Sequence, residues 1–448
     1  MVIKKEVEIG GRLFSLETGR YAKQANGAVM VTYGDTMVLV TAVASPEAKE
    51  GMDYFPLQVE YREKTSAAGK FPGGYIKREG RPTEKEILSA RLCDRPIRPL
   101  FPESFNNETQ VVAMVFSYDG ENDADVLAAC GASAALMVSD IPFDGPMGEV
   151  RVGRIGGEFI VNPTHEQIKL SDIELVVAGT ADSIMMVEGE SKEVSEQDLL
   201  DALKFAQAEI KKIVELQNQL RAEAGKVKWT VAEKVIDENL KKDVYDLAEA
   251  KFKEIVYSIL TKEERSAKNK ELSEFVKQSL AEKYPEQEKV IGEILHDMEK
   301  DLMRERILKE GIRLDGRNTK QVRPITIELG VLPRTHGSAL FTRGETQSLT
   351  TVTLGTKNDE QTIDGLLEEY SKKFYLQYNF PPFSVGEVGR MTGVGRREIG
   401  HGNLAERSLK QVFPADEVFP YTVRIISDIL ESNGSSSMAT VCAGSLAM

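Results

Sequence analysis

The stretch that decides the fold is GAVMVTYGDTMVLVTAV, residues 27–43, because the chain returns to the same pattern as GSALFTRGETQSLTTVT at residues 337–353. Both stretches alternate in side-chain character, contain many β-branched residues and break at a glycine followed by an acid, as a β-hairpin does. Aligned without gaps, they share Gly27/Gly337, Thr32/Thr342, Gly34/Gly344, Thr36/Thr346, Leu39/Leu349 and Thr41/Thr351, with Asp35 opposite Glu345. The sequence therefore predicts the same hairpin twice.

The match continues downstream and indicates an internal repeat. The further corresponding blocks are 92–95 and 404–407 (Leu-x-Asp/Glu-Arg), 101–102 and 413–414 (Phe-Pro), and 124–136 and 434–446 (rich in small residues). All blocks keep the same order at an offset of about 310 residues. The last pair favours a helix that packs against a sheet, so each copy is expected to be a β-rich unit with packed helices.

The first copy continues beyond its small-residue helix, whereas the second ends inside the corresponding one. Strand-like runs follow in the first copy at residues 148–153, 173–178 and 183–187. The chain stops at Met448, where the repeat predicts a buried helix. We therefore expect the second domain to be incomplete in this chain and the natural protein to be longer.

Between the copies, residues 193–310 have a helical pattern. Apolar residues recur at helical spacing from Glu196 to Leu220, and only Pro285 interrupts the charged run Asp237–Arg306. We interpret this region as a solvated helical connector, the alternative being a surface that contacts RNA or a partner. The predicted fold class is α/β (α+β), with two β-rich domains joined by an all-helical one. The predicted boundaries are 1–230, 231–308 and 309–448.

The composition excludes several classes of protein. With 448 residues and a formal net charge of −14, the chain is not expected to coat nucleic acid nonspecifically, although a local basic site is allowed. Cys93, Cys130 and Cys442 form no C-x-x-C pair, which argues against a disulfide framework or a structural zinc site. No apolar run of about 18 residues predicts a membrane span, and none follows Met1 as a signal peptide. We expect a cytoplasmic protein without membrane contact.

The sharpest candidate site is ESNGSSSMA at residues 431–439, which follows an extended run and precedes the small-residue helix. A Gly/Ser turn entering a helix presents backbone N–H groups and hydroxyls at the positive end of the helix dipole, which suits phosphate. An ordinary N-cap is the alternative, but three consecutive serines, Ser435, Ser436 and Ser437, exceed that need. In the gapless alignment the first copy has Asp125 at this place, so phosphate binding is expected in the second copy only.

A second candidate differs between the copies in the same way. GRREIGHG at residues 395–402 opposes TEKEILSA at residues 83–90, which has neither adjacent arginines nor a histidine. Arg396 and Arg397 can grip phosphate oxygens through their fork geometry. His401 either donates to a phosphate or is structural.

A third candidate is the basic segment Lys70–Pro102. Tyr75 precedes Lys77 and Arg78 in a glycine loop, and Arg81 follows, which suits an aromatic that stacks on a base beside cations that bind the backbone. The alternative is a solvated charged helix. Three further arginines of the segment can equally form internal ion pairs: Arg91, Arg95 and Arg98. We expect the loop to contact single-stranded RNA.

No acidic cluster beside the serine–arginine site predicts a metal site. Asp428 and Glu431 are candidates by proximity alone, and the acids Asp364, Glu368 and Glu369 fit a solvated helix equally well. Phosphodiester chemistry commonly uses a divalent cation held by carboxylates. The metal ligands are therefore expected beyond Met448.

These motifs resemble those of bacterial polynucleotide phosphorylases. The resemblance is carried by residues 77–82 (KREGRP), 94–102 (DRPIRPLFP), 395–402 (GRREIGHG) and 432–439 (SNGSSSMA), and it covers the whole chain. It implies two RNase PH-like domains around an all-helical domain, a homotrimeric ring, a catalytically silent first domain, and KH and S1 domains after the core. The implied activity is Mg²⁺-dependent phosphorolysis of RNA from its 3′ end, which releases nucleoside diphosphates and serves mRNA degradation.

The resemblance also implies roles for individual residues. Phosphate is expected at Ser435, Ser436 and Ser437, at Arg396 and Arg397, and near His401, whereas Tyr75, Lys77, Arg78 and Arg81 are expected on the loop that constricts the central channel. The family often shows two aromatics in that loop, whereas Ile76 follows the single tyrosine here. Inorganic phosphate would attack the last phosphodiester, and the reverse reaction would polymerise diphosphates.

Two alternatives remain open from the sequence. One is a hydrolytic or tRNA-trimming relative of the same fold, in which water replaces phosphate. The other is a non-catalytic RNA-binding ring or scaffold, possible above all for the 448-residue chain, which we expect to be inactive by itself. An RNA-degradation complex is a further possible partner.

Overall fold

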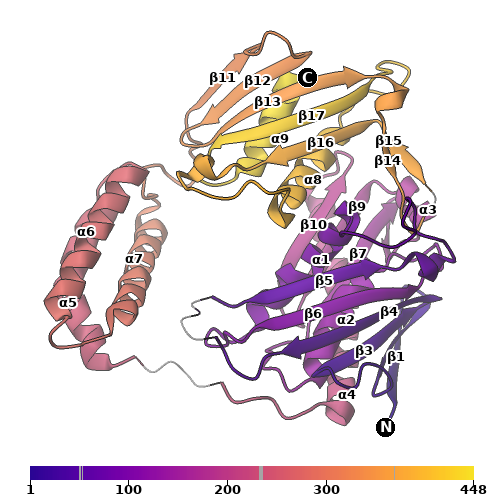
Figure 1. Cartoon of the computed structure of the whole chain (residues 1–448), viewed down its shortest axis with the longest axis horizontal. Helices are drawn as coiled ribbons and strands as arrows, with labels where there is room; N and C mark the ends of the chain where they lie inside the picture. The colour runs from indigo at the N-terminus through magenta and orange to yellow at the C-terminus, as the bar shows by residue number, and fades with distance from the viewer. Residues whose placement is uncertain (50–51, 53, 232–235, 368) are drawn as a thin grey trace. The chain divides into compact units, whose positions relative to one another are not determined.

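The computed structural model describes residues 1–49, 52, 54–231, 236–367 and 369–448 (Figure 1). The chain forms two compact units. The larger unit combines Met1–Val231 with Thr326–Met448 and so contains both copies of the repeat, and the smaller unit is Ala232–Ile325.

The first copy begins with a six-stranded sheet in the order β1-β2-β3-β4-β6-β5. Its strands are β1 Ile3–Ile9, β2 Arg12–Thr18, β3 Gly27–Tyr33, β4 Thr36–Ala44, β5 Leu57–Glu63 and β6 Thr109–Ser117. β3 and β4 form the predicted hairpin, in which Tyr33 pairs with Thr36. Helix α1 (Glu84–Ile97) connects the parallel strands β5 and β6, and a capping box between Thr83 and Glu86 begins it.

Helix α2 (Asp125–Val138) is buried along its whole length because it lies between two sheets. One side packs on β3, β4 and β6, and the other packs on β7 of a four-stranded sheet ordered β10-β9-β7-β8. The remaining elements of this half are β7 Gly148–Ile155, β8 Glu158–Val161, α3 His165–Leu170, β9 Ile173–Gly179, β10 Ile184–Ser191 and α4 Glu196–Ala224. The small side chains predicted to pack tightly therefore form the centre of the first copy.

The second copy repeats this topology, which confirms the predicted repeat. Its sheet has the order β11-β12-β13-β17-β16, and the last pair is again parallel. Its elements are β11 Ile325–Leu329, β12 Gly337–Arg343, β13 Gln347–Gly355, β16 Phe374–Asn379, α8 Arg396–Lys410, β17 Thr422–Glu431 and α9 Ser436–Ala447. Helix α9 packs on β12, β13 and β17 as α2 packs on its sheet, and α8 packs on β16 (Figure 1).

One shared glycine explains part of the sequence identity between the copies. A Cβ at Gly27 would lie 1.9 Å from the Ala135 carbonyl oxygen of α2, and a Cβ at Gly337 would lie 2.1 Å from the Ala447 carbonyl oxygen of α9. No side chain fits at such distances. Both copies therefore need glycine at this position for the helix to approach the sheet.

The described part of residues 193–310 is mainly helical, as predicted, but it buries apolar faces and is not a merely solvated connector. Helix α4 buries an apolar face that includes Ala202, Ile210 and Leu220 in the core of the larger unit. The smaller unit has a hydrophobic core of its own, to which Leu240, Phe252, Val276, Ile291 and Met298 belong. Its helices are α5 Glu238–Tyr257, α6 Lys262–Leu280 and α7 Glu288–Glu310.

The acidic segment 364–369 is not helical in its described part. It connects the short paired strands β14 (Gln361–Ile363) and β15 (Tyr370–Lys372). Glu368 lies outside the described residues. The alternative of a solvated helix is therefore wrong for Asp364 and Glu369, because both residues lie in the connection between two paired strands.

Candidate functional site

The turn between β17 and α9 holds the three serines. β17 ends at Glu431 and α9 begins at Ser436, and the chain passes between them with φ of 93° at Gly434 and 52° at Ser435. Arg343 fixes the turn from strand β12, since its guanidinium donates to the carbonyl oxygens of Gly434 and Ser435 at 3.0 Å each. The turn is thus held from behind, and the side chains of the serines and the first N–H groups of α9 are what it offers a ligand.

The three serines differ in what they present. Ser435 is exposed and Ser437 is half-buried, whereas Ser436 is only 2% exposed. The Ser436 hydroxyl lies 2.7 Å from the Tyr378 hydroxyl of β16, so this side chain faces the core. Ser435 provides no side-chain cap to α9. The N–H groups of the first helical turn therefore stay available at the positive end of the helix dipole.

Two aromatic rings connect helix α8 to the serine turn. The Arg397 guanidinium carbon lies 5.1 Å from the centroid of the Phe380 ring, and Phe380 stacks on Tyr378 with centroids 6.3 Å apart. His401 meets the Tyr378 ring in a T-shaped arrangement at 5.1 Å. Since the Tyr378 hydroxyl reaches Ser436, the structure brings Arg397, His401 and the serine turn into one site.

This site carries an unbalanced positive charge. Within the described part of the chain no carboxylate pairs with Arg397, whose guanidinium lies over the Phe380 ring. Burial lowers the pKa of His401 to about 4, and Arg397 and Arg91 add to that effect, so the imidazole is neutral near neutral pH. Its buried Nδ1 has no hydrogen-bond partner among the described residues. A fixed cation beside a neutral imidazole favours an anion.

Arg396, which is adjacent in sequence, has a different environment. Its guanidinium donates to the Val59 carbonyl oxygen at 2.5 Å and pairs with the carboxylate of Glu60, both on β5. The expectation that both arginines bind phosphate is therefore not met by this arrangement. A carboxylate already balances the charge of Arg396, which leaves Arg397 as the arginine able to attract an anion.

Contacts of the hairpins fix which helix residues correspond between the copies. The Thr36 hydroxyl donates to the Asn122 carbonyl oxygen and the Thr346 hydroxyl donates to the Gly434 carbonyl oxygen, each at 3.3 Å. The glycine contacts to α2 and α9 give the same register. Ser435 thus corresponds to Asp123, and Ser437 corresponds to Asp125. The gapless alignment, which set Asp125 opposite Ser435, is wrong by two residues.

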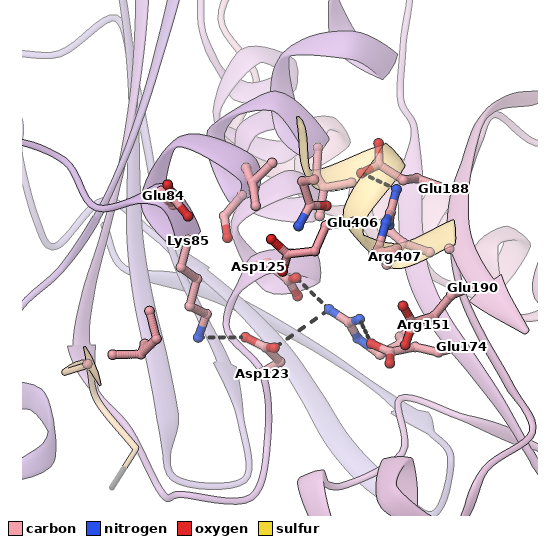
Figure 2. A pocket seen from close by; sticks show the side chains of 18 of the residues that line it. Glu84, Lys85, Asp123, Asp125, Arg151, Glu174, Glu188, Glu190, Glu406 and Arg407 are labelled. Carbon is pink, nitrogen blue, oxygen red and sulfur yellow. Dashed lines mark hydrogen bonds and ion pairs between the residues drawn. The ribbon is translucent and has the colours of Figure 1, made fainter. Parts of the chain in front are cut away.

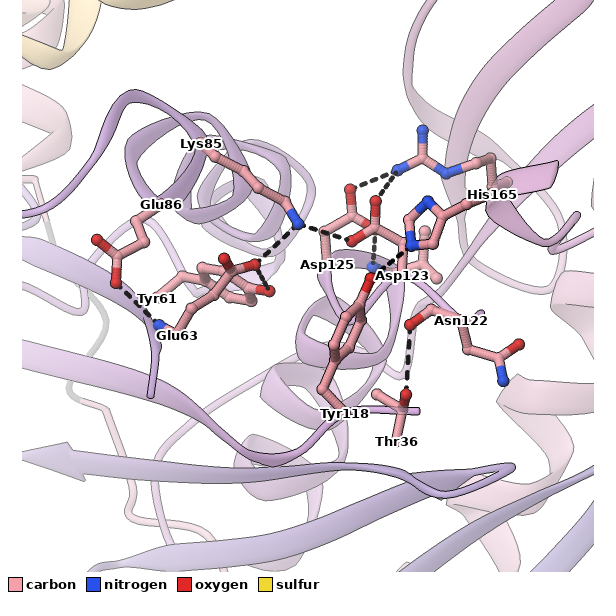
Figure 3. A network of polar contacts seen from close by, with 12 residues as sticks. Thr36, Tyr61, Glu63, Lys85, Glu86, Tyr118, Asn122, Asp123, Asp125 and His165 are labelled. Carbon is pink, nitrogen blue, oxygen red and sulfur yellow. Dashed lines mark hydrogen bonds and ion pairs between the residues drawn. The ribbon is translucent and has the colours of Figure 1, made fainter. Parts of the chain in front are cut away.

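The first copy surrounds the corresponding cation with carboxylates (Figure 3). Lys85 is the second residue of α1, as Arg397 is of α8. Its Nζ lies 2.9 Å from Glu63 and 3.4 Å from Asp123. Strand pairing places Glu63 where the second copy has Phe380. The aromatic neighbour of the cation in one copy is therefore an acidic neighbour in the other.

Arg151 of β7 extends this network on the other side of the two aspartates (Figure 2). Its guanidinium pairs with Asp125 at 2.5 Å, lies 3.6 Å from Asp123 and also pairs with Glu174. Burial would raise the pKa of Asp123, but Lys85 and Arg151 outweigh burial and hold it well below its usual range. Asp123 is therefore ionised, and both cations of this network have carboxyl groups as partners.

A chain of hydroxyl groups lies behind the serine turn of the second copy. The Ser427 hydroxyl lies 2.8 Å from both Ser348 and Thr440, and Thr440 donates to the Ser436 carbonyl oxygen at 3.1 Å. At the corresponding positions of the first copy stand Val38, Ala113, Ala128 and Ala124. The second copy thus has a polar support beneath its turn where the first copy has an apolar core.

The loop predicted to contact RNA lies before α1. Tyr75 is fully exposed, and Lys77 adopts a positive φ of 52°. Arg78 and Arg81 line a cavity of about 500 Å³ to which Tyr75 does not contribute. Glu79 holds the loop by accepting from the backbone and hydroxyl of Thr65 at 3.2 and 3.1 Å. The four predicted side chains therefore share a loop but not a single pocket.

Two of the three arginines for which ion pairing was the alternative, Arg95 and Arg98, form such pairs. Arg95 pairs with Glu188, and Arg98 pairs with Asp94 at 2.7 Å. Arg91 lies against Gly400 of α8, where an added Cβ would be 2.4 Å from its Nε. These arginines connect the two copies or stabilise α1.

The metal candidates do not form a site within the described ranges. No group of three or more His, Cys, Asp or Glu side chains there is arranged to hold a metal ion. Asp428 accepts a hydrogen bond from Asn379 at 2.8 Å, and Glu431 is exposed at the end of β17. Among the same residues, no helix is long and apolar enough to cross a membrane.

Tyr378, Phe380 and Arg343 were not predicted as site residues. Each could have been found by extending the repeat: Tyr378 corresponds to Tyr61, and Phe380 replaces an acid, Glu63, two residues later. Arg343 replaces Tyr33 in the aligned hairpin. Substitutions that add a cation or remove an acid in one copy only are therefore the signal for this site.

Comparisons with known proteins give matches along most of the chain. Residues 10–142 and 321–448 match the family model described as 3′ exoribonuclease family, domain 1, and residues 145–209 match domain 2 of that family. Residues 239–318 match a polyribonucleotide nucleotidyltransferase RNA binding domain. The fold class of two related domains around a helical one is thereby confirmed.

Individual relatives agree with these family matches. Polyribonucleotide nucleotidyltransferases are 55% identical in Chlorobium phaeobacteroides and 56% identical in Chlorobaculum parvum over 100% of this chain, and 56% identical in Geobacter sulfurreducens over 99% of it. The chain spans 64% of the length of each of these curated relatives. The solved structure of rice (Oryza sativa) Rrp46 matches 46% of this chain and 94% of its own, at 15% identity and a TM-score of 0.39.

Proposed function

Because the chain belongs to the 3′ exoribonuclease family, we propose that it is the phosphate-binding part of a phosphorolytic 3′-to-5′ exoribonuclease that releases nucleoside diphosphates from RNA. One observation carries the proposal. The second copy keeps an unbalanced cation, Arg397, beside the open N-terminus of α9, whereas its counterpart Lys85 is surrounded by acids. The chain spans 64% of the length of the curated relatives, so the activity of a whole protein of this family remains a proposal here.

Phosphate is held in this proposal by groups that point outward. The Ser435 and Ser437 side chains, the first N–H groups of α9 and the Arg397 guanidinium supply donors and positive charge. The neutral His401 supplies no charge and can only exchange hydrogen bonds. Tyr378 fixes the turn through its bond to Ser436.

The reaction is a displacement at phosphorus. An oxygen of inorganic phosphate bonds to the phosphorus of the last nucleotide, and the bond from that phosphorus to the preceding 3′ oxygen breaks. The departing 3′ oxygen takes the proton that the phosphate gives up, leaving a free 3′ hydroxyl and a nucleoside diphosphate. The protein's contribution is to position the phosphate and to stabilise charge. The reverse reaction polymerises diphosphates.

Several finer features belong to the same proposal. Single-stranded RNA contacts the loop with Tyr75, Lys77, Arg78 and Arg81, which is supported by the exposure of these side chains. The three domains extend over 1–230, 231–308 and 309–448. A homotrimer, a cytoplasmic location and an RNA-degradation complex are further proposals.

The described residues do not fit a Mg²⁺ site, since they form no cluster of three metal-ligating side chains. We assign no step to the cation. A Mg²⁺ requirement is proposed only for the longer protein, with ligands beyond Met448.

The test is product analysis with poly(A) and the full-length protein, with and without inorganic phosphate. Adenosine diphosphate that appears only with phosphate supports the proposal. Adenosine monophosphate formed without phosphate would indicate a hydrolytic relative. RNA binding without any mononucleotide product would favour a non-catalytic scaffold.

A further inference from the structure

Asp123 and Asp125 occupy a distinctive place in the first copy. They correspond to Ser435 and Ser437, the two serines of the second copy whose side chains are not taken up by the core. Asp123 precedes helix α2 and Asp125 is its first residue. Two carboxyl groups therefore stand at the helix N-terminus where the second copy has two hydroxyls; Asp123 has a lowered pKa, whereas burial raises the pKa of Asp125 although Arg151 opposes it.

Both aspartates face cations rather than solvent. Lys85 lies 3.4 Å from Asp123, and Arg151 lies 2.5 Å from Asp125. Arg151 is buried, with a side chain only 9% exposed, and its Nε has no hydrogen-bond partner among the described residues. All four residues line a cavity of about 440 Å³ (Figure 2). The first copy thus retains two cations, Lys85 and Arg151, at the place that corresponds to the phosphate site, in a cavity that is also lined by acids.

We propose that Asp123 and Asp125 act as built-in anions, which occupy the phosphate position of the first copy and exclude inorganic phosphate from it. The inference rests on the proposed function in so far as the second copy defines the phosphate position. A phosphate entering the first copy would meet two fixed carboxylates, and like charges in contact disfavour binding strongly. The first copy is silent in this account because its anion site is already filled.

The neighbouring residues fit a filled site. Glu63 adds a third carboxylate beside Lys85, at the position of the uncharged Phe380. His165 also lines the cavity, and its Nε2 lies 2.6 Å from the Tyr118 hydroxyl. Burial lowers the pKa of His165 despite the nearby Asp123. An entering anion would meet more carboxyl groups than cations, since the cavity lining adds five acids and three bases to these residues: Glu84, Glu174, Glu188, Glu190, Glu406, Lys372, Arg407 and Lys410.

The experiment removes the built-in anions and supplies phosphate instead. The full-length protein carries Asp123→Ser and Asp125→Ser, which copies the serines of the second copy. Arg397→Ala is added to weaken the second-copy site, and isothermal titration with inorganic phosphate follows. We expect one new phosphate site per chain, compared with none in the Arg397→Ala parent, and a melting temperature that rises with phosphate.

Controls separate this proposal from its rivals. Adding Lys85→Ala to the double variant should abolish the new site, and the isosteric pair Asp123→Asn and Asp125→Asn should also create it if the serine pair fails to fold. A folded variant of either kind that binds no phosphate overturns the proposal and leaves a purely structural ion network. Phosphate titrations of the wild type and of Arg397→Ala, compared with each other, report on the second copy alone. Failure of the proposed function would therefore be seen independently.

Discussion

Replacing Arg397 by alanine removes the cation of helix α8 that faces the site and that no carboxylate pairs with among the described residues. Its guanidinium carbon lies 5.1 Å from the centroid of the Phe380 ring. The counterpart of Arg397 in the first copy, Lys85, has the carboxylate of Glu63 beside it instead of an aromatic ring. A unit charge about 4 Å from phosphate contributes about 4 kcal/mol at an effective dielectric constant of about 20. Loss of one preorganised electrostatic group costs about 10²–10³ in rate, or about 2.7–4 kcal/mol, which agrees with that figure.

The assay is release of adenosine diphosphate from poly(A) by the full-length protein over a range of phosphate concentrations. We expect Arg397→Ala to lower kcat/KM for phosphate by about 10²–10³. Arg397→Lys keeps the positive charge but loses the planar guanidinium with its paired donors. Its kcat/KM for phosphate should therefore lie between those of the wild type and Arg397→Ala. Lys410→Ala removes an exposed cation from the last turn of the same helix and serves as the matched control. Near-native turnover by Arg397→Ala would refute the assignment.

Three further predictions concern the support of the site and the first copy. Tyr378→Phe removes the partner of the buried Ser436 hydroxyl and should lower the free energy of unfolding by about 1–3 kcal/mol in urea titrations. It should also raise KM for phosphate more than it lowers kcat; an unchanged KM would show that the turn does not depend on this bond. Phosphate bound near His401 favours the imidazolium and should raise the pKa of His401 from about 4. Identical NMR titration curves of His401 with and without phosphate would contradict that proximity. Arg151→Met leaves the buried carboxylate of Asp125 without its partner and should cost about 3–5 kcal/mol of unfolding free energy, so a loss below about 1 kcal/mol would indicate a solvated network.

The repeat was predictable because short stretches of sequence specify its hairpins without reference to distant residues. Alternation and the glycine-acid turns specify each hairpin, and the shared glycine opposite the helix backbone is required by close packing. The same comparison located the serine turn and the arginine pair, since both differ between the copies. The order of the strands, with a parallel pair at the edge, is the same in both copies but was not predicted from the sequence.

Other features depend on tertiary contacts that the sequence does not display. Loop residues before α2 shift its register by two positions, which is why Asp123 and not Asp125 corresponds to Ser435. Neighbouring arginines on a helix point in different directions, so Arg396 meets Glu60 whereas Arg397 does not. The predicted boundary at residue 230 placed α4 (Glu196–Ala224) in the first domain, but helical periodicity alone did not show that it buries an apolar face in the core there.

The measurement that tests the central claim most directly is phosphate binding by the full-length protein with Ser435→Asp. This substitution places in the second copy the carboxylate that the first copy has as Asp123, and aspartate tolerates the positive φ of this position. Ser435→Asn has the same shape without the charge and is the matched control. We predict that isothermal titration shows one phosphate per chain in the wild type, an affinity within a few-fold of it in Ser435→Asn, and a loss of at least about 100-fold in Ser435→Asp. Equal phosphate affinity in the aspartate and asparagine variants would contradict the account.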